Sequence, residues 1–260
     1  MTTTNPTSQP TRTDRVTPAV SRPPRVSWLG LLIAAGCATI ASFVIAMIIA
    51  GSVEGFFVAM AVPIVVGLLV VWRWRRTGIA VLGVVLLAEL ASSAPFLADA
   101  LTHPEIPADF LPLALFTLAT LAGSIAAVPA FRQTRQPVGA SRAATAVAGV
   151  AVLIMVAATA VSIVAAGRVD SVTAQPGDIA LTTTDFQFDT RSVTADAGTV
   201  AVTVTNDDAT RHTFTIDELG VDLNVPPGTT QRVTFPADTG TYRFYCIPHA
   251  TDMVGDLVVR

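Results

Sequence analysis

Near its C-terminus the chain reads Tyr242-Arg243-Phe244-Tyr245-Cys246-Ile247-Pro248-His249-Ala250-Thr251-Asp252-Met253-Val254-Gly255. Tyr242, Phe244 and Cys246 alternate with period two, which is typical of a strand that buries one face. Cys246, His249 and Met253 then fall within eight positions, where this strand would leave its sheet. Such a loop has the side chains to surround a metal ion. The segment therefore predicts an all-β domain with a metal-binding loop.

The same strand-like pattern extends over residues 178–260, as short segments rich in Thr, Val and Phe that are separated by Gly, Pro, Asn and Asp. Two more sets of side chains share one face of a strand, Val200, Val202 and Val204 in one and His212, Phe214 and Ile216 in the other. The polar residues between them are expected to point outward. Turn signals occur at Asp207-Asp208, Pro226-Pro227-Gly228 and Asp238-Thr239-Gly240. About eight strands fit, which predicts a Greek-key sandwich.

The chemistry of the loop favours copper. A thiolate, two imidazoles and a distant thioether form the trigonal set that copper uses in electron-transfer sites. Cys246, His249 and Met253 supply three of these groups. His212 is the candidate for the second imidazole because it opens an inward-facing strand, whereas His103 lies in a loop of the apolar region. Zinc would take a tighter tetrahedral set, and a binuclear copper centre would need a second cysteine in the domain. One copper ion is expected. In the alternative interpretation, Cys246 and Met253 are core residues and the domain binds no metal.

Residues 178–260 resemble a cupredoxin, the blue-copper domain of the plastocyanin and amicyanin type. The resemblance rests on Asn206-Asp207-Asp208-Ala209-Thr210-Arg211-His212, the Pro-Pro-Gly turn, Gly240-Thr241-Tyr242-Arg243-Phe244-Tyr245-Cys246, the Cys-x₂-His spacing, and Met-x-Gly before a final Leu-Val-Val strand. It implies an eight-stranded sandwich with copper near one end, ligated by His212, Cys246, His249 and axial Met253. Three residues separate His249 from Met253, between the two of amicyanin and the four of plastocyanin. The resemblance therefore leaves the axial bond length and the reduction potential open.

The N-terminal half has the composition of a membrane domain. Of the 260 residues, 52% are apolar and 13% are charged, against about 25% charged in soluble proteins. Five apolar stretches approach or exceed the ~20 residues that cross a bilayer, at about 28–51, 56–72, 78–101, 110–131 and 143–166. We therefore expect a disordered cytoplasmic tail at 1–26, a transmembrane helical domain at 27–167, a linker at 168–177 and the β-domain at 178–260. The first stretch is too long for the core of a cleaved signal peptide.

Arginine sets the expected orientation, because short cytoplasmic loops carry the excess of positive charge. Arginines cluster before the first stretch, after the second, and between the fourth and fifth, while the intervening loops 52–55 and 102–109 carry Glu54, Glu105 and Asp109 and no arginine. The N-terminus is thus expected inside and the C-terminal domain outside, in a multi-pass protein of the cytoplasmic membrane. The two cysteines, Cys37 and Cys246, lie in different domains and are not expected to form a disulfide.

These features predict a membrane-anchored blue copper protein that transfers single electrons at the outer face of the membrane, with no catalytic residues of its own. The expected partners are the lipid membrane and an unidentified extracytoplasmic or membrane redox partner. A net charge of −3 gives no support for nucleic acid. The alternative is a protein that captures, delivers or senses copper. Glu89, near the middle of the third stretch, and His103, in an outer loop, would favour it. Otherwise Glu89 is a packed polar group and His103 a solvated one.

Overall fold

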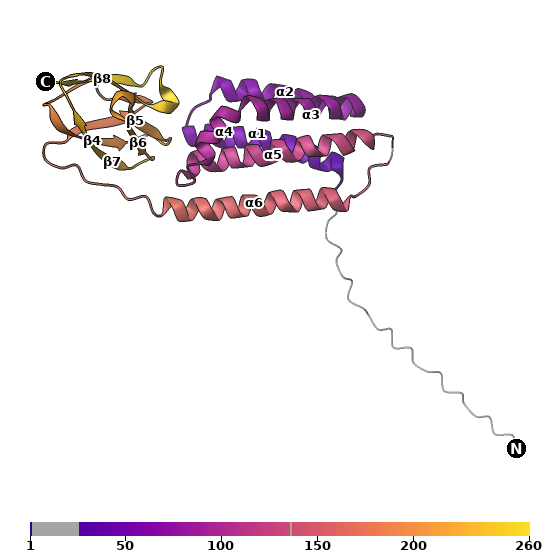
Figure 1. Ribbon diagram of the computed structural model, residues 1–260. Coiled ribbons are helices and arrows are strands. Elements are labelled where there is room, and N and C mark those ends of the chain that lie inside the picture. Colours follow the sequence, from indigo (N-terminus) through magenta and orange to yellow (C-terminus); the bar gives the residue numbers. More distant parts are fainter. Residues whose placement is uncertain (2–25, 136) are drawn as a thin grey trace.

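The computed structural model describes residues 1, 26–135 and 137–260, so the expected tail at 1–26 lies almost wholly outside the described residues. A set of helices lies on one side and a β-sandwich packs at its end (Figure 1). The helices are α1 Trp28–Ala50, α2 Gly55–Arg73, α3 Arg75–Ser92, α4 Ala94–Leu101, α5 Pro107–Arg132 and α6 Arg142–Ala166. By length and composition α1, α2, α5 and α6 can each cross a membrane, and the bent pair α3–α4 is a fifth candidate.

The third apolar stretch is not one straight helix. The chain bends by 60° between α3 and α4, around Ser93. Pro95 explains the break, because it has no N–H to donate to the carbonyl of Ala91 and its ring opposes a continuous helix. As a result α4 runs along the end of the helical bundle that faces the β-domain (Figure 1). The bend also places Glu89 in the last turn of α3 rather than in the middle of a long span.

Small residues set the spacing of the helices. A Cβ at Gly78 of α3 would lie 2.1 Å from the backbone nitrogen of Val71 in α2, and a Cβ at Gly123 of α5 would lie 2.9 Å from the Cβ of Ala35 in α1. Such close approach is how helices associate in lipid, where the solvent is as apolar as the side chains. Cys37 lies on the exposed face of α1 and is a free cysteine.

The β-domain is a sandwich of two sheets with strand orders β2-β1-β4-β7 and β3-β9-β8-β5-β6. Pairs β1–β4 and β3–β9 are parallel and the other pairs are antiparallel. The nine strands, one more than expected, include a two-residue β2, and short 3₁₀ turns η1 Asp217–Leu219 and η2 Ile247–His249 interrupt the chain. The strands are β1 Ile179–Thr184, β2 Gln187–Phe188, β3 Ser192–Ala195, β4 Gly198–Asn206, β5 His212–Ile216, β6 Val221–Val225, β7 Thr230–Ala237, β8 Gly240–Tyr245 and β9 Val254–Val259.

The buried faces predicted from period two are confirmed for the apolar residues. Tyr242 is half-buried, and the other seven are buried in one core: Val200, Val202, Val204, Phe214, Ile216, Phe244 and Cys246. The outward direction expected of the intervening polar residues is wrong at Thr213 and Thr215 of β5 and at Thr203 of β4, which are buried as well. Their hydroxyl groups are satisfied inside the domain. The Thr213 Oγ1 accepts from the Ile247 N–H at 2.8 Å, and the Thr215 hydroxyl donates to Thr213 Oγ1 at 3.0 Å. Hydrogen-bonded hydroxyls can be buried at little cost.

The turn predicted at Pro226-Pro227-Gly228 is confirmed, and the other two predicted turn sites lie in the connections from β4 to β5 and from β7 to β8. At Pro226-Pro227-Gly228 the Thr229 N–H donates to the Pro226 carbonyl at 3.2 Å, and Gly228 takes a φ of 66°, which glycine adopts without steric cost. The segment after α6 is bound to the sandwich: the Val172 N–H donates to the Thr230 carbonyl and the Thr230 N–H to the Ser171 hydroxyl, both at 2.9 Å. Part of the expected linker therefore lies along the edge of β7.

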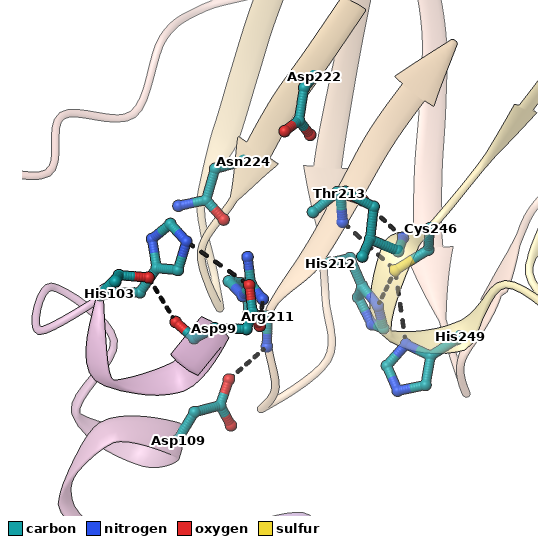
Figure 2. Close-up of polar contacts among 12 residues, drawn as sticks. Asp99, His103, Asp109, Arg211, His212, Thr213, Asp222, Asn224, Cys246 and His249 are labelled. Atoms are coloured by element: carbon teal, nitrogen blue, oxygen red, sulfur yellow. Dashed lines mark hydrogen bonds and ion pairs between the residues drawn. The ribbon is translucent and has the colours of Figure 1, made fainter. Parts of the chain in front are cut away.

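Polar contacts dock the β-domain on the helices. The Arg211 guanidinium pairs with Asp99, and the Arg211 backbone N–H lies 3.4 Å from an oxygen of Asp109 (Figure 2). The Asn224 amide donates to Glu105 at 3.3 Å. The Arg211 side chain is only 7% exposed and the Asp99 side chain 48% exposed, so the ion pair is shielded from water on the Arg211 side alone. These contacts determine which face of the β-domain meets the helix ends.

Candidate metal centre

The loop between β8 and β9 carries three of the four predicted ligands and is closed by its own hydrogen bonds. The Cys246 N–H donates to the Met253 carbonyl at 3.0 Å, and the Met253 N–H donates to the His249 carbonyl at 2.9 Å. Between them, η2 turns the chain so that His249 folds back toward Cys246. Local hydrogen bonds therefore hold the shape of the loop.

His212, Cys246 and His249 form one group (Figure 2). Cys246 Sγ lies 3.6 Å from His212 Nδ1 and 3.5 Å from His249 Nδ1, and the three candidate ligand atoms all lie within 4.8 Å of one another. His212 comes from the first position of β5, 34 residues before Cys246, as the strand pattern predicted. Met253 is fully buried at the close of the same loop.

Neighbouring groups orient the histidines and the sulfur. His212 Nε2 lies 2.7 Å from Asp208 Oδ2, which directs Nδ1 to the sulfur. The Thr213 N–H points at Cys246 Sγ at 3.4 Å and would stabilise a thiolate. The Asp208 carboxylate also accepts the N–H groups of Asp185 and Phe186, two residues held at positive φ in the turn between β1 and β2. That turn places the Phe186 ring 5.0 Å from the His249 ring.

Burial controls the charge of the group. Desolvation lowers the pKa of His212, and desolvation together with the nearby His212 lowers the pKa of His249 to about 4. Desolvation raises the pKa of the Cys246 thiol, against the effect of the backbone N–H groups of Thr213 and His249. At neutral pH both imidazoles are thus neutral and able to donate a lone pair. A metal that binds here must displace the proton of Cys246.

The two other predicted residues lie outside this group. Glu89 is 8% exposed, and its Oε2 has no hydrogen-bond partner among the residues that the structure describes. His103 follows α4, with Nδ1 2.8 Å from Glu105 Oε1 and Nε2 3.9 Å from Asp99 Oδ1. Its ring is therefore engaged by carboxylates at the interface between the two parts of the molecule.

Sequence reasoning did not identify the residues that support the ligands. Asn206 is fully buried. Its Oδ1 accepts from the Thr183 hydroxyl and the Asp208 N–H, and its Nδ2 donates to the carbonyls of Thr210 and Val225. It thereby fixes the crossing from β4 to β5 that delivers His212. The signal was the Asn-Asp-Asp run before His212, which sequence alone identifies only as a turn.

Part of the chain matches a known protein family. Residues 147–259 match the family model of the cupredoxin-like domain; the match begins inside α6 and ends with the last residue of β9. No curated protein sequence matches the chain.

Solved structures similar to the chain include several of amicyanin. A reduced tryptophan-to-tyrosine variant has 22% identity and a TM-score of 0.29, over 34% of this chain and 86% of that one. A Cu(I) methionine-to-alanine variant has 22% identity and a TM-score of 0.28, over 36% and 89%. Amicyanin from Paracoccus versutus has 17% identity and a TM-score of 0.29, over 34% and 85%.

The family match covers the whole sandwich, and the histidine–cysteine–histidine group lies inside the matched residues. The chain therefore contains a cupredoxin-like domain, preceded by helices apolar enough to span a membrane.

Proposed function

We propose that this chain is a membrane-anchored type 1 copper protein that passes single electrons at the outer face of the cytoplasmic membrane. The observation that carries the proposal is the group formed by His212, Cys246 and His249, in which both imidazole Nδ1 atoms face one sulfur. The match to the cupredoxin-like domain supports it.

The donor set fits copper. One thiolate and two neutral imidazoles form the trigonal set of blue copper sites, and Met253 in the same loop is the expected weak axial ligand. When bound, copper supplies one-electron chemistry between Cu(II) and Cu(I). The chain's own part is to hold the donors. The closed loop, the Asp208 contact to His212 and the Thr213 N–H keep them in place, so little has to rearrange when an electron moves.

Copper loading of the purified full chain in detergent tests the proposal. With Cu(II), the wild type should develop an intense visible band that disappears on reduction. Cys246→Ser should lack the band because the sulfur-to-copper charge transfer needs the thiolate. A folded protein that stays colourless in Cu(II) would overturn the proposal, and rapid exchange of copper with a chelator in both redox states would favour copper handling instead.

The membrane orientation is part of the same proposal and rests on the arginine clusters at one set of helix ends. An N-terminus inside and five crossings put the β-domain outside. Protease is added to cells whose outer layers have been removed and whose cytoplasmic membrane is intact. It should then digest the β-domain and spare the N-terminal tail. Cleavage of the tail with protection of the β-domain would reverse the orientation.

A further inference from the structure

A cavity of about 570 Å³ lies where the β-domain docks on the helices. Its walls come from α1, α2, α4 and α5 on one side and from Arg211 and η2 on the other. Its volume falls in the range of about 300–1,000 Å³ that is usual for small-molecule sites. The walls divide into an apolar part and a polar part.

The apolar part is built of phenylalanine rings. The Phe43 ring stacks on Phe57, with centroids 5.7 Å apart, and lies 5.6 Å from the Phe116 ring. All three belong to α1, α2 or α5, helices that can cross a membrane, so this part of the cavity adjoins the region where lipid would lie. Aromatic walls of this kind favour a flat ring that can stack offset or edge to face.

The polar part selects by charge. Asp99 and Asp109 both line it and face a single cation, Arg211, while the nearby His103 is held by Glu105. Arg211, the one guanidinium among the described residues that line the cavity, is already paired with Asp99, so it offers little attraction to an anionic phospholipid headgroup. Carboxylate and imidazole acceptors instead suit a neutral molecule whose hydroxyl groups donate hydrogen bonds, and the other N–H groups of Arg211 can donate to its carbonyl oxygens when it is oxidised.

His249 links the cavity to the metal centre. Its Nδ1 lies 3.5 Å from Cys246 Sγ, while the residue itself, with Ile247 and Pro248, lines the cavity. Figure 2 shows the His249 ring at the edge of the group, with Arg211 and the two aspartates on the other side of His212 in this view. A molecule in the cavity therefore contacts the outer edge of a candidate ligand.

We propose that this cavity binds a lipid-soluble quinone or its hydroquinone, with the ring against Phe43, Phe57 and Phe116 and its oxygens at the polar end beside His249. The inference rests on the proposed function, since it names the class of small molecule that meets the electron-transfer domain from the membrane side.

Photolabelling of metal-free full chain in phosphatidylcholine nanodiscs tests it. The probe is an azido-benzoquinone with a decyl tail, and the competitor is the decyl-benzoquinone without the azide. Labelled peptides should come from the ends of α1 and α2 that line the cavity and from residues 247–249, and the competitor should suppress them. Two results would overturn the inference in favour of a lipid-filled cavity. One is labelling spread over all lipid-facing helix surfaces, and the other is labelling that phosphatidylglycerol displaces and the quinone does not.

A matched pair of variants on α1 localises the binding. Ala46 lines the cavity, while Ala41 lies on the exposed face of the same helix. Ala46→Trp should weaken quinone binding by about tenfold or more, because an indole fills space that the ring needs. Ala41→Trp should bind as the wild type does. Equal binding by wild type and Ala46→Trp contradicts the inference; if Ala46→Trp does not fold, Ala46→Leu replaces it.

The two proposals can fail separately. Cys246→Ser removes the sulfur but leaves the walls of the cavity unchanged, so it should be photolabelled as the wild type is. A colourless wild type that still binds the quinone refutes the copper assignment alone. A blue wild type that fails to bind the quinone refutes the cavity assignment alone.

Discussion

Met253 is the candidate ligand that can be replaced with the least change of shape. It is fully buried at the end of the ligand loop. Met253→Leu should keep copper bound through the other three donors and cost about 1 kcal/mol or less in stability, since the volumes are similar. The reduction potential should rise, because a weak axial thioether donor is lost. Voltammetry measures it, with Met155→Leu on α6 as control. An unchanged potential would mean that Met253 is not a ligand.

Asn206 should matter more for stability than its polar character suggests. Asn206→Ala leaves the buried Thr183 hydroxyl and several backbone groups without partners, which should cost about 2 kcal/mol or more in unfolding free energy. Asn224→Ala is the matched control, because the Asn224 side chain makes a single hydrogen bond, of 3.3 Å, at the interface. Denaturant unfolding of the two variants provides the comparison. Equal losses would show that the Asn206 network contributes nothing of its own.

At the scale of elements, Gly255 controls how β9 packs beside β8. A Cβ there would lie 2.3 Å from Phe244 Cζ and 2.9 Å from the Arg191 carbonyl oxygen. Gly255→Ala should therefore displace the Phe244 ring and destabilise the domain by about 2 kcal/mol. Gly240→Ala, at the start of β8, meets only the Tyr242 ring at 3.4 Å and serves as control. Thermal unfolding compares them; similar melting temperatures would mean that the backbone relaxes around the new methyl group.

Asp178 joins the start of the β-domain to β7 and to β4. Its carboxylate accepts from the Arg232 guanidinium at 2.8 and 2.9 Å and from the Thr203 hydroxyl at 2.7 Å. These bonds, with the Gln175 N–H, hold the pKa of Asp178 well below its usual range. Asp178→Asn should lower the melting temperature of the metal-free β-domain by about 5 °C at pH 6.

The same contact predicts a pH dependence. Because the folded pKa lies below the unfolded value of about 3.9, the stabilisation is complete above that value and is lost as the pH falls through the folded pKa. The difference in melting temperature between wild type and Asp178→Asn should shrink as the pH falls below 4. Asp196 is exposed, and the melting temperature of Asp196→Asn should differ little from that of wild type at any pH. A gap that stays constant on acidification would argue against an ionised Asp178.

For the whole molecule, Arg211 decides whether the β-domain stays docked. Its guanidinium pairs with Asp99 of α4 on the helical side. In the β-domain, Arg211 directly precedes the candidate ligand His212 in the chain. Arg211→Ala should loosen the interface and raise hydrogen exchange in residues 99–110 by about tenfold, while the copper spectrum is retained because all ligands remain. Arg243→Ala, an exposed arginine of β8, is the control. Unchanged exchange in 99–110 would show that other contacts hold the domains together.

Much of the architecture follows from local pattern. Period-two alternation identified the buried faces of β4, β5 and β8, the proline and glycine runs identified the turns, and the loop from Cys246 to Met253 was visible as a ligand loop. The apolar stretches predicted helices long enough to span a membrane. Such features are readable because period, turn residues and ligand spacing are properties of neighbouring residues along the chain.

What the sequence by itself determined is therefore the fold class, most of the elements and the identity of the candidate ligands, but not the bend between α3 and α4 or the ninth strand. Only the tertiary structure decided the burial of Thr213 and Thr215, the Asn206 network, the Phe186 ring beside His249, and the docking of Arg211 on Asp99. The last of these contacts joins residues 112 positions apart. Contacts at such separation depend on how whole elements pack, and packing leaves no periodic signal in the chain.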